Sequence, residues 1–233
     1  MQPIPLILLP GMMCDSRMYA SQMLALADLA ECRVGNIGGA NNMADIAAQV
    51  LVQAPDKFAL AGLSMGGIVA MEIIRQAPER VTRLALMDTN PRAEEDTVKM
   101  TRQPQIEAVR AGQLEPLLRE TMAPRYFTTQ EAHKQFDQLC VDMALSLGKD
   151  VFERQSLALK NRRDQRETLA RFDKPCLVLM GEADDICPLE MHECMVTLLS
   201  NVAFVKIHNA AHIPTLEQPA ATSAALRQWM VQK

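Results

Sequence analysis

Hydrophobic residues fall into short continuous runs that alternate with longer segments of helical periodicity. The continuous runs have the length of strands buried on both faces of a parallel sheet; they span residues 4–9, 32–37, 57–61, 83–88, 176–180 and 203–207. Between several of them apolar residues recur every three or four positions, as on one face of a helix, and predict helices over 16–30, 43–51 and 65–76. Strands that alternate with helices predict an α/β fold, with about six mostly parallel strands and helices on both faces of the sheet.

The segment from about residue 92 to about residue 168 interrupts this alternation. It is helical in character and rich in charge, and it is too long for a simple connection. Its position before the fifth expected strand predicts a helical cap inserted into a single domain of residues 1–233. Its aromatic side chains either line an apolar pocket or pack the helices of the cap together; they are Tyr126, Phe127, Phe136 and Phe152.

A basic run follows these aromatic residues. It could attract an anionic substrate, but the acidic residues among its members favour a solvated helix face; the run is Lys160, Arg162, Arg163, Arg166 and Arg171.

Composition narrows the classes of partner. The 233 residues carry a formal net charge of −4, with 48% hydrophobic and 22% charged residues, so neither nucleic acid nor an anionic membrane is expected as a partner. No apolar stretch approaches the roughly 18 residues of a membrane span, and the first residues lack the basic start of a signal sequence. The six cysteines form no CxxC pair and no zinc-like cluster. We therefore expect free thiols, no metal and a cytoplasmic location.

The clearest chemical signal is the sequence Gly62-Leu63-Ser64-Met65-Gly66, which lies between an expected strand and an expected helix. A serine at such a sharp turn projects its hydroxyl above the sheet. Glycines two residues before and after it avoid collisions with the neighbouring strand and helix. Because the short pattern also arises by chance, the flanking strand and helix carry most of the argument. Ser64 is the candidate nucleophile.

A serine nucleophile needs a base and an acid that orients the base. Active sites of parallel sheets lie at the carboxyl ends of the strands. His212 follows the last expected strand in a loop and is the favoured base, with His208 as the fallback. The acid should follow another strand, between the serine and the histidine. The loop after the fifth strand offers Asp184 and Asp185, and Asp88 after the fourth strand is a third candidate.

Two backbone amides are candidates for an oxyanion hole. Met65 follows the nucleophile at the positive end of a helix dipole. Met12 lies in the loop after the first strand, where Gly11 is expected to let the chain turn the next amide inward. The side chains of Met12 and Met13 are also candidate pocket walls, although core filling is the default for any of the 16 methionines.

Together these residues resemble the α/β-hydrolase superfamily. The resemblance runs nearly end to end, through LLPG at 8–11, GLSMGG at 62–67, APERV at 77–81, PCLVLMGEADDICP at 175–188 and AAHIPTLEQP at 210–219. It is most similar to the branch of esterases, lactonases and enol-lactonases with a small helical cap. The resemblance implies that Asp184 is the acid and His212 the base, with Glu217 and Pro219 as flanking structural residues. Two features depart from the family pattern: Pro10-Gly11 replaces the usual His-Gly, and the customary hairpin before the first strand is absent.

The expected function is hydrolysis of a small or medium carboxylic ester, lactone or thioester through a Ser-His-Asp triad and an acyl-enzyme, without metal or organic cofactor. One alternative is a non-hydrolytic enzyme on the same triad, performing C–C bond cleavage, perhydrolysis or acyl transfer. The other is a non-catalytic small-molecule receptor, which has no need of a strained elbow. The physiological substrate and the oligomeric state do not follow from the fold.

Overall fold

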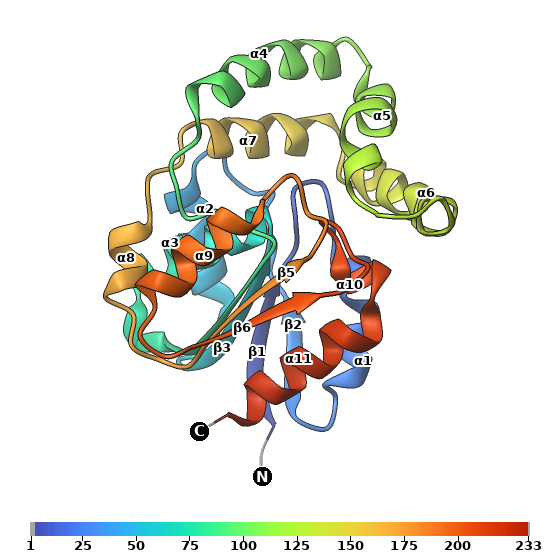
Figure 1. Ribbon diagram of the computed structural model, residues 1–233. Coiled ribbons are helices and arrows are strands. Elements are labelled where there is room, and N and C mark those ends of the chain that lie inside the picture. The colour runs from blue at the N-terminus through green and yellow to red at the C-terminus, as the bar shows by residue number, and fades with distance from the viewer. Residues whose placement is uncertain (1–2, 233) are drawn as a thin grey trace.

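The computed structural model describes residues 3–232, which form a central sheet of six parallel strands (Figure 1). The strand order is β2-β1-β3-β4-β5-β6. The strands are β1 (Ile4–Leu9), β2 (Ala30–Val34), β3 (Phe58–Leu63), β4 (Val81–Met87), β5 (Cys176–Gly181) and β6 (Val202–Ile207). Every residue of β3 and of β5 is buried, which explains why their sequences are continuously apolar rather than alternating. The predicted parallel α/β fold is confirmed.

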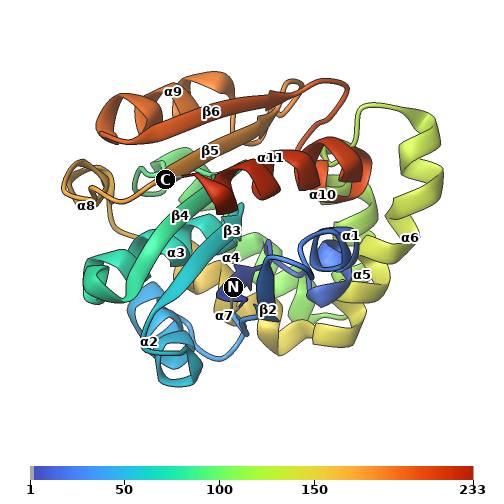
Figure 2. The same ribbon diagram turned by 90° about the horizontal axis from the view of Figure 1, so that it is seen from below.

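Helices cover both faces of the sheet, as Figure 2 shows from below. On one face lie α2 (Met43–Gln53), α3 (Met65–Gln76) and α9 (Leu189–Leu198), packed on strand residues such as Ile7 and Leu60. On the other face lie α1 (Ala20–Ala25) and α11 (Pro219–Val231), packed on residues such as Leu6 and Ala59. Successive residues of a strand therefore enter different cores, because side chains alternate across a sheet.

The residues between β4 and β5, here called the β4–β5 segment, contain no strand among the described residues and form a series of helices. These are α4 (Asp96–Arg110), α5 (Leu114–Leu117), a π-helical turn (Leu118–Met122), a 3-10 turn (Ala123–Arg125), α6 (Gln130–Leu147), α7 (Lys149–Lys160) and α8 (Arg166–Ala170). Helices α4 to α7 lie together beyond one end of the sheet, whereas α8 lies beside α3 and α9 (Figure 1). Within residues 3–232, no helix is both long enough and apolar enough to cross a bilayer.

The structure corrects the sequence-based limits of the first helix and the second strand. The sequence predicts a helix over 16–30, but Ser16–Tyr19 form a 3-10 turn and α1 ends at Ala25. The sequence places the second strand at 32–37, but β2 begins at Ala30 and ends at Val34. The reason is pairing with β1, which aligns Ile4 with Ala30 and Leu8 with Val34. Strand limits depend on the partner strand as well as on local hydrophobicity.

Candidate active site

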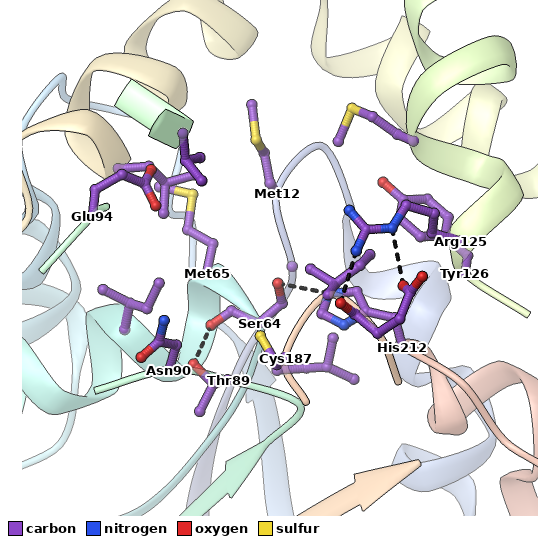
Figure 3. Close-up of a pocket in the computed structure, with 18 of the residues that line it drawn as sticks. Met12, Ser64, Met65, Thr89, Asn90, Glu94, Arg125, Tyr126, Cys187 and His212 are labelled. Atoms are coloured by element: carbon purple, nitrogen blue, oxygen red, sulfur yellow. Dashed lines mark hydrogen bonds and ion pairs between the residues drawn. The ribbon is translucent and has the colours of Figure 1, made fainter. Parts of the chain in front are cut away.

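Ser64 occupies a tight turn between the end of β3 and the start of α3. Its φ of 54° and ψ of −118° place it in a region that residues other than glycine rarely adopt, at a cost of about 1–3 kcal/mol. The Ser64 N–H donates to Met87 O at 2.9 Å. The Thr89 hydroxyl donates to Ser64 O at 2.7 Å (Figure 3). Hydrogen bonds from β4 and the residues after it therefore hold the strained turn.

Two glycines make this turn sterically possible. A Cβ atom on Gly62 would lie 2.3 Å from Gly66 O, and one on Gly66 would lie 2.1 Å from Leu9 O. Both distances are far below van der Waals contact, so β1, β3 and α3 can approach this closely only because glycine occupies both positions. The sequence prediction of a strand, a sharp turn and a helix describes this arrangement correctly.

His212 lies in the loop between β6 and α10 (Pro214–Glu217) and faces Ser64 (Figure 3). Its Nε2 atom is 2.9 Å from Ser64 Oγ, and its Nδ1 atom is 2.9 Å from Asp184 Oδ2. With the proton on Nδ1, the ring donates to Asp184 and accepts the hydroxyl proton of Ser64 at Nε2. His208, the alternative base, is 79% exposed and pairs with Glu182 instead.

The His212 loop is held on two sides. Glu217 Oε2 accepts from Ala211 N at 2.8 Å, and Oε1 accepts from the N–H and the hydroxyl of Thr128, both at 2.6 Å. The Tyr126 ring stacks on the His212 ring, with centroids 6.2 Å apart. The β4–β5 segment therefore helps to orient the imidazole.

Of the three candidate acids, Asp184 is the one that contacts His212. Its Oδ1 atom accepts two backbone N–H bonds, from Ile186 at 2.9 Å and Cys187 at 3.1 Å. Burial works to raise the pKa of Asp184, but the charge and hydrogen bond of His212, with the two N–H donors, hold it below its usual range. Asp185 is exposed and pairs with Arg125 at 2.9 Å.

Asp88, the third candidate, accepts a hydrogen bond from the last residue of β5, the strand that precedes the Asp184 loop. It is fully buried at the end of β4, and its Oδ1 atom accepts from Gly181 N at 2.8 Å. Burial, and after it the negative charge of Asp184, raise the pKa of Asp88 well above its usual range. The raised pKa favours the protonated, neutral form of Asp88.

Met65 directly follows Ser64, and Met12 follows Gly11, where an added Cβ atom would lie 3.7 Å from Ser64 Cβ. Met65 is the first residue of α3, so its N–H has no partner within the helix. Within residues 3–232, neither the Met12 N–H nor the Met65 N–H donates a hydrogen bond to a side chain or to a backbone carbonyl of a turn or loop. A Cβ atom on Gly11 would make only ordinary contacts, at 3.6–3.8 Å, so close packing does not require glycine at this position. The left-handed residue of this turn is Met13, with φ of 56°.

Gln155 of α7 is a residue that the sequence patterns did not single out. Its side chain is buried, and its Oε1 atom accepts from Met13 N at 2.9 Å. The bond fixes the turn that presents the Met12 amide. The only local signal for it is a polar residue on the buried face of α7, beside Phe152 and Ser156.

A cavity of about 670 Å³ opens above Ser64, between the carboxyl ends of the strands and helices α4 and α7. Of the predicted pocket residues, Met12, Tyr126 and Phe152 line it. Three do not. Met13 is buried in the core beside β1, and Phe127 and Phe136 pack against each other with centroids 5.5 Å apart. These two aromatic rings serve helix packing, which was the alternative considered for each.

Polar side chains that the sequence patterns did not assign to a pocket also line this cavity. They are Thr89, Asn90, Glu94, Thr101, Arg102 and Arg162. Arg162 is 7% exposed, which separates it from the exposed Arg163, Arg166 and Arg171 of the same basic run.

Within residues 3–232, one group of side chains brings three metal-ligand types together: Asp184, Cys187 and His212, with ligand atoms within 4.8 Å of one another. The hydrogen bond between Asp184 and His212 already accounts for two of them. Burial raises the pKa of the Cys187 thiol well above its usual value, so the thiolate that metals bind is disfavoured. The six cysteines are free thiols.

Comparison with known proteins gives a consistent result. Residues 6–225 match a family model described as the alpha/beta hydrolase family. The chain is 29% identical over 189 residues to a pimeloyl-acyl carrier protein methyl ester esterase of Pectobacterium carotovorum, covering 78% of this chain and 74% of the relative. A protein of the same name from Klebsiella pneumoniae is 29% identical over 191 residues, covering 78% and 73%.

Two solved structures are similar to this chain in fold. A malate-bound thermophilic esterase from Thermogutta terrifontis is 29% identical, with a TM-score of 0.89, over 97% of this chain and 89% of the esterase. The enol-lactonase from Burkholderia xenovorans LB400 has the same fold, with a TM-score of 0.89 at 19% identity, over 100% and 93% of the two chains.

The family match covers most of the chain and includes every motif on which the sequence resemblance depends. With the esterases among the relatives, it confirms the expected enzyme class, a hydrolase of the carboxylic ester type. The chain belongs to the alpha/beta hydrolase family.

Proposed function

We propose that this protein hydrolyses small or medium-sized carboxylic esters, lactones or thioesters through an acyl-enzyme on Ser64. The observation that carries the proposal is the pair of 2.9 Å hydrogen bonds linking Ser64 to His212 and His212 to Asp184. A cavity of suitable volume adjoins Ser64. The name of the curated relatives, methyl ester esterase, supports an ester as the substrate.

In the proposed reaction, Ser64 Oγ attacks the carbonyl carbon while His212 Nε2 takes its proton. The amides of Met12 and Met65 donate to the oxyanion of the tetrahedral intermediate. The intermediate collapses, and the alcohol or thiol leaves with the proton from His212. Water then attacks the acyl-enzyme with His212 as base, and the carboxylic acid departs. Asp184 holds the imidazole in the required tautomer and stabilises the imidazolium.

We also propose that α4 to α7 act as a cap on a single α/β domain. Side chains of α4 and α7 line the cavity opposite the strand ends, and Tyr126 stacks on His212. Such a cover excludes bulk water, which strengthens hydrogen bonds to the oxyanion. The cytoplasmic location stays a prediction.

The proposal is tested with nitrophenyl esters of short and medium acyl chains. We expect wild-type protein to release nitrophenol. Ser64→Ala should lower kcat by about 10⁴-fold or more, because only the oxyanion hole and substrate binding would remain. Ser200→Ala, at an exposed serine, is the matched control, and melting temperatures check that both variants fold.

Other results would redirect the assignment. Turnover by Ser64→Ala near the wild-type rate would remove the nucleophile assignment. Wild-type protein that binds esters without cleaving them would indicate a receptor. Products formed preferentially with an added alcohol or peroxide would indicate acyl transfer or perhydrolysis.

A further inference from the structure

One wall of the cavity carries two arginines that share a single carboxylate. Arg102 comes from α4, Arg162 follows α7, and Glu94 lies in the loop after β4. Arg102 Nη2 is 2.8 Å from Glu94 Oε2, and Arg162 Nη1 is 2.7 Å from Glu94 Oε1. The three side chains are only 14%, 7% and 4% exposed. This group is therefore an integral part of the pocket wall.

The three residues hold two positive charges and one negative charge. The ionised groups that act on Arg162 are Glu94 and Arg102, and its other titratable neighbour is the Cys187 thiol. Two other acidic residues line the cavity, but neither neutralises the second positive charge of this group. Asp185 pairs with Arg125, and Glu95 is exposed. Since a guanidinium stays protonated in proteins, this wall carries one uncompensated positive charge. A buried charge without a counter-charge is costly, and a ligand anion would relieve that cost.

Arg102 lines the cavity and bonds Glu94 through its Nε and Nη2 atoms. Its Nη1 atom is 3.7 Å from the sulfur of Met12, and a thioether is a weak acceptor. The backbone N–H of Met12 is one of the two proposed oxyanion donors. The guanidinium therefore lies beside the far end of the Met12 side chain. In Figure 3, Glu94 lies across the pocket from His212 and Arg125.

We propose that the substrate carries a carboxylate that binds to Arg102 and Arg162 while its ester or lactone carbonyl lies at Ser64. This inference rests on the proposed function and narrows its substrate class to half-esters of dicarboxylic acids and lactones that bear a carboxylate. A planar guanidinium matches a carboxylate with two parallel hydrogen bonds. Arg125 does not share this role, because it is 47% exposed and already neutralised by Asp185.

The test compares matched substrates. Monomethyl esters of dicarboxylic acids, from succinate to suberate, are each paired with the neutral methyl ester of the monocarboxylic acid of equal chain length. We expect wild-type kcat/KM to favour the carboxylate-bearing ester about 10-fold or more for at least one length, since a hydrogen-bonded charge pair contributes that much. The advantage should appear mainly in KM, because the carboxylate is bound equally in the ground state and the transition state.

Arg102→Gln should lower this preference by about 10-fold, with the loss concentrated on the carboxylate-bearing esters. Arg110→Gln is the matched control, because Arg110 lies on the same helix but is 58% exposed and pairs with Glu153 away from the cavity. It should leave both rates unchanged. Glu94→Gln raises the positive excess and should increase the preference, which tests the charge argument in the opposite direction even where Arg102→Gln folds poorly.

Equal rates on every wild-type pair, or equal losses on both substrate types in Arg102→Gln, would show that the arginines only connect the segments they bridge. A fall in preference in Glu94→Gln would contradict the charge argument. Failure of the proposed function looks different: wild-type protein would then hydrolyse neither member of any pair.

Discussion

At the residue scale, Asp184 and Asp185 are adjacent in the chain but occupy opposite environments. Asp184 is 5% exposed and accepts hydrogen bonds from His212 and two backbone amides. The Asp185 side chain is 68% exposed and forms an ion pair at the pocket rim. Exposed pairs contribute roughly 0–1 kcal/mol, whereas a buried acid that fixes the tautomer of a catalytic base affects the reaction itself.

Asp184→Asn should therefore lower kcat by about 10⁴-fold, because an amide favours the wrong imidazole tautomer. Asp185→Asn is the matched control and should stay within a few-fold of wild type. The kcat of each variant on a nitrophenyl ester shows which aspartate orients His212. A larger loss in Asp185→Asn would reverse the assignment of the acid.

Asp88 predicts how stability depends on pH. Because its pKa is raised in the folded protein, the folded chain keeps a proton that the unfolded chain releases above about pH 4. The contribution of Asp88 to stability is then complete below that pH and is lost as the pH rises toward the raised folded-state pKa. Asp88→Asn keeps an acceptor for Gly181 N–H and cannot ionise. Its free energy of unfolding relative to wild type should increase with pH, by at most about 1.4 kcal/mol per pH unit.

Denaturant titrations of both proteins from about pH 4 to about pH 8, the interval above the ordinary aspartate pKa, measure this difference. Asp185→Asn, at an exposed position, is the control for the removal of one aspartate charge. A difference for Asp88→Asn that is constant, or that shrinks as the pH rises, would mean that Asp88 is ionised in the folded protein.

At the scale of elements, α7 is coupled to the turn after β1. The coupling is the hydrogen bond from Met13 N to Gln155 Oε1, between residues 142 positions apart. The turn carries the Met12 amide, so a helix of the β4–β5 segment sets the position of a proposed oxyanion donor. Displacing such a donor weakens an interaction made mainly in the transition state.

Gln155→Leu should therefore lower kcat by about 10-fold with a smaller change in KM, a partial form of the loss seen when a donor is removed. It should also destabilise the fold by about 1–3 kcal/mol, because the buried Met13 N–H loses its acceptor. Gln135→Leu, at an exposed position of α6, is the control. Lower stability with an unchanged kcat would show that the bond supports the fold without positioning the oxyanion donor.

At the scale of the whole molecule, the sheet ends and the β4–β5 segment enclose a cavity of about 670 Å³. This volume lies within the range of about 300–1,000 Å³ typical of small-molecule sites. We expect kcat/KM on a nitrophenyl ester series to decline beyond medium acyl chains, and activity to survive a chelator, because the proposed mechanism uses no metal. Preference for long-chain triglyceride, or loss of activity with a chelator, would contradict this expectation.

The sequence alone determined the features that depend on local pattern. The apolar runs predicted all six strands, because a strand buried on both faces must be apolar throughout. The strand, turn and helix around Ser64 were predictable because the glycine requirement is local. His212 was predictable because parallel strands bring their carboxyl ends to one edge of the sheet.

Tertiary structure decided what depends on which side chains meet across the chain. Asp184 and Asp185 have the same chemistry and almost the same position, and only the direction of each side chain separates them. Arg162 resembles the other members of its basic run in sequence, yet of that run only Arg162 pairs with Glu94 inside the cavity. Gln155 gives little local indication that it contacts Met13. Burial and long-range contacts arise from packing between elements, which the periodicity of a single element does not encode.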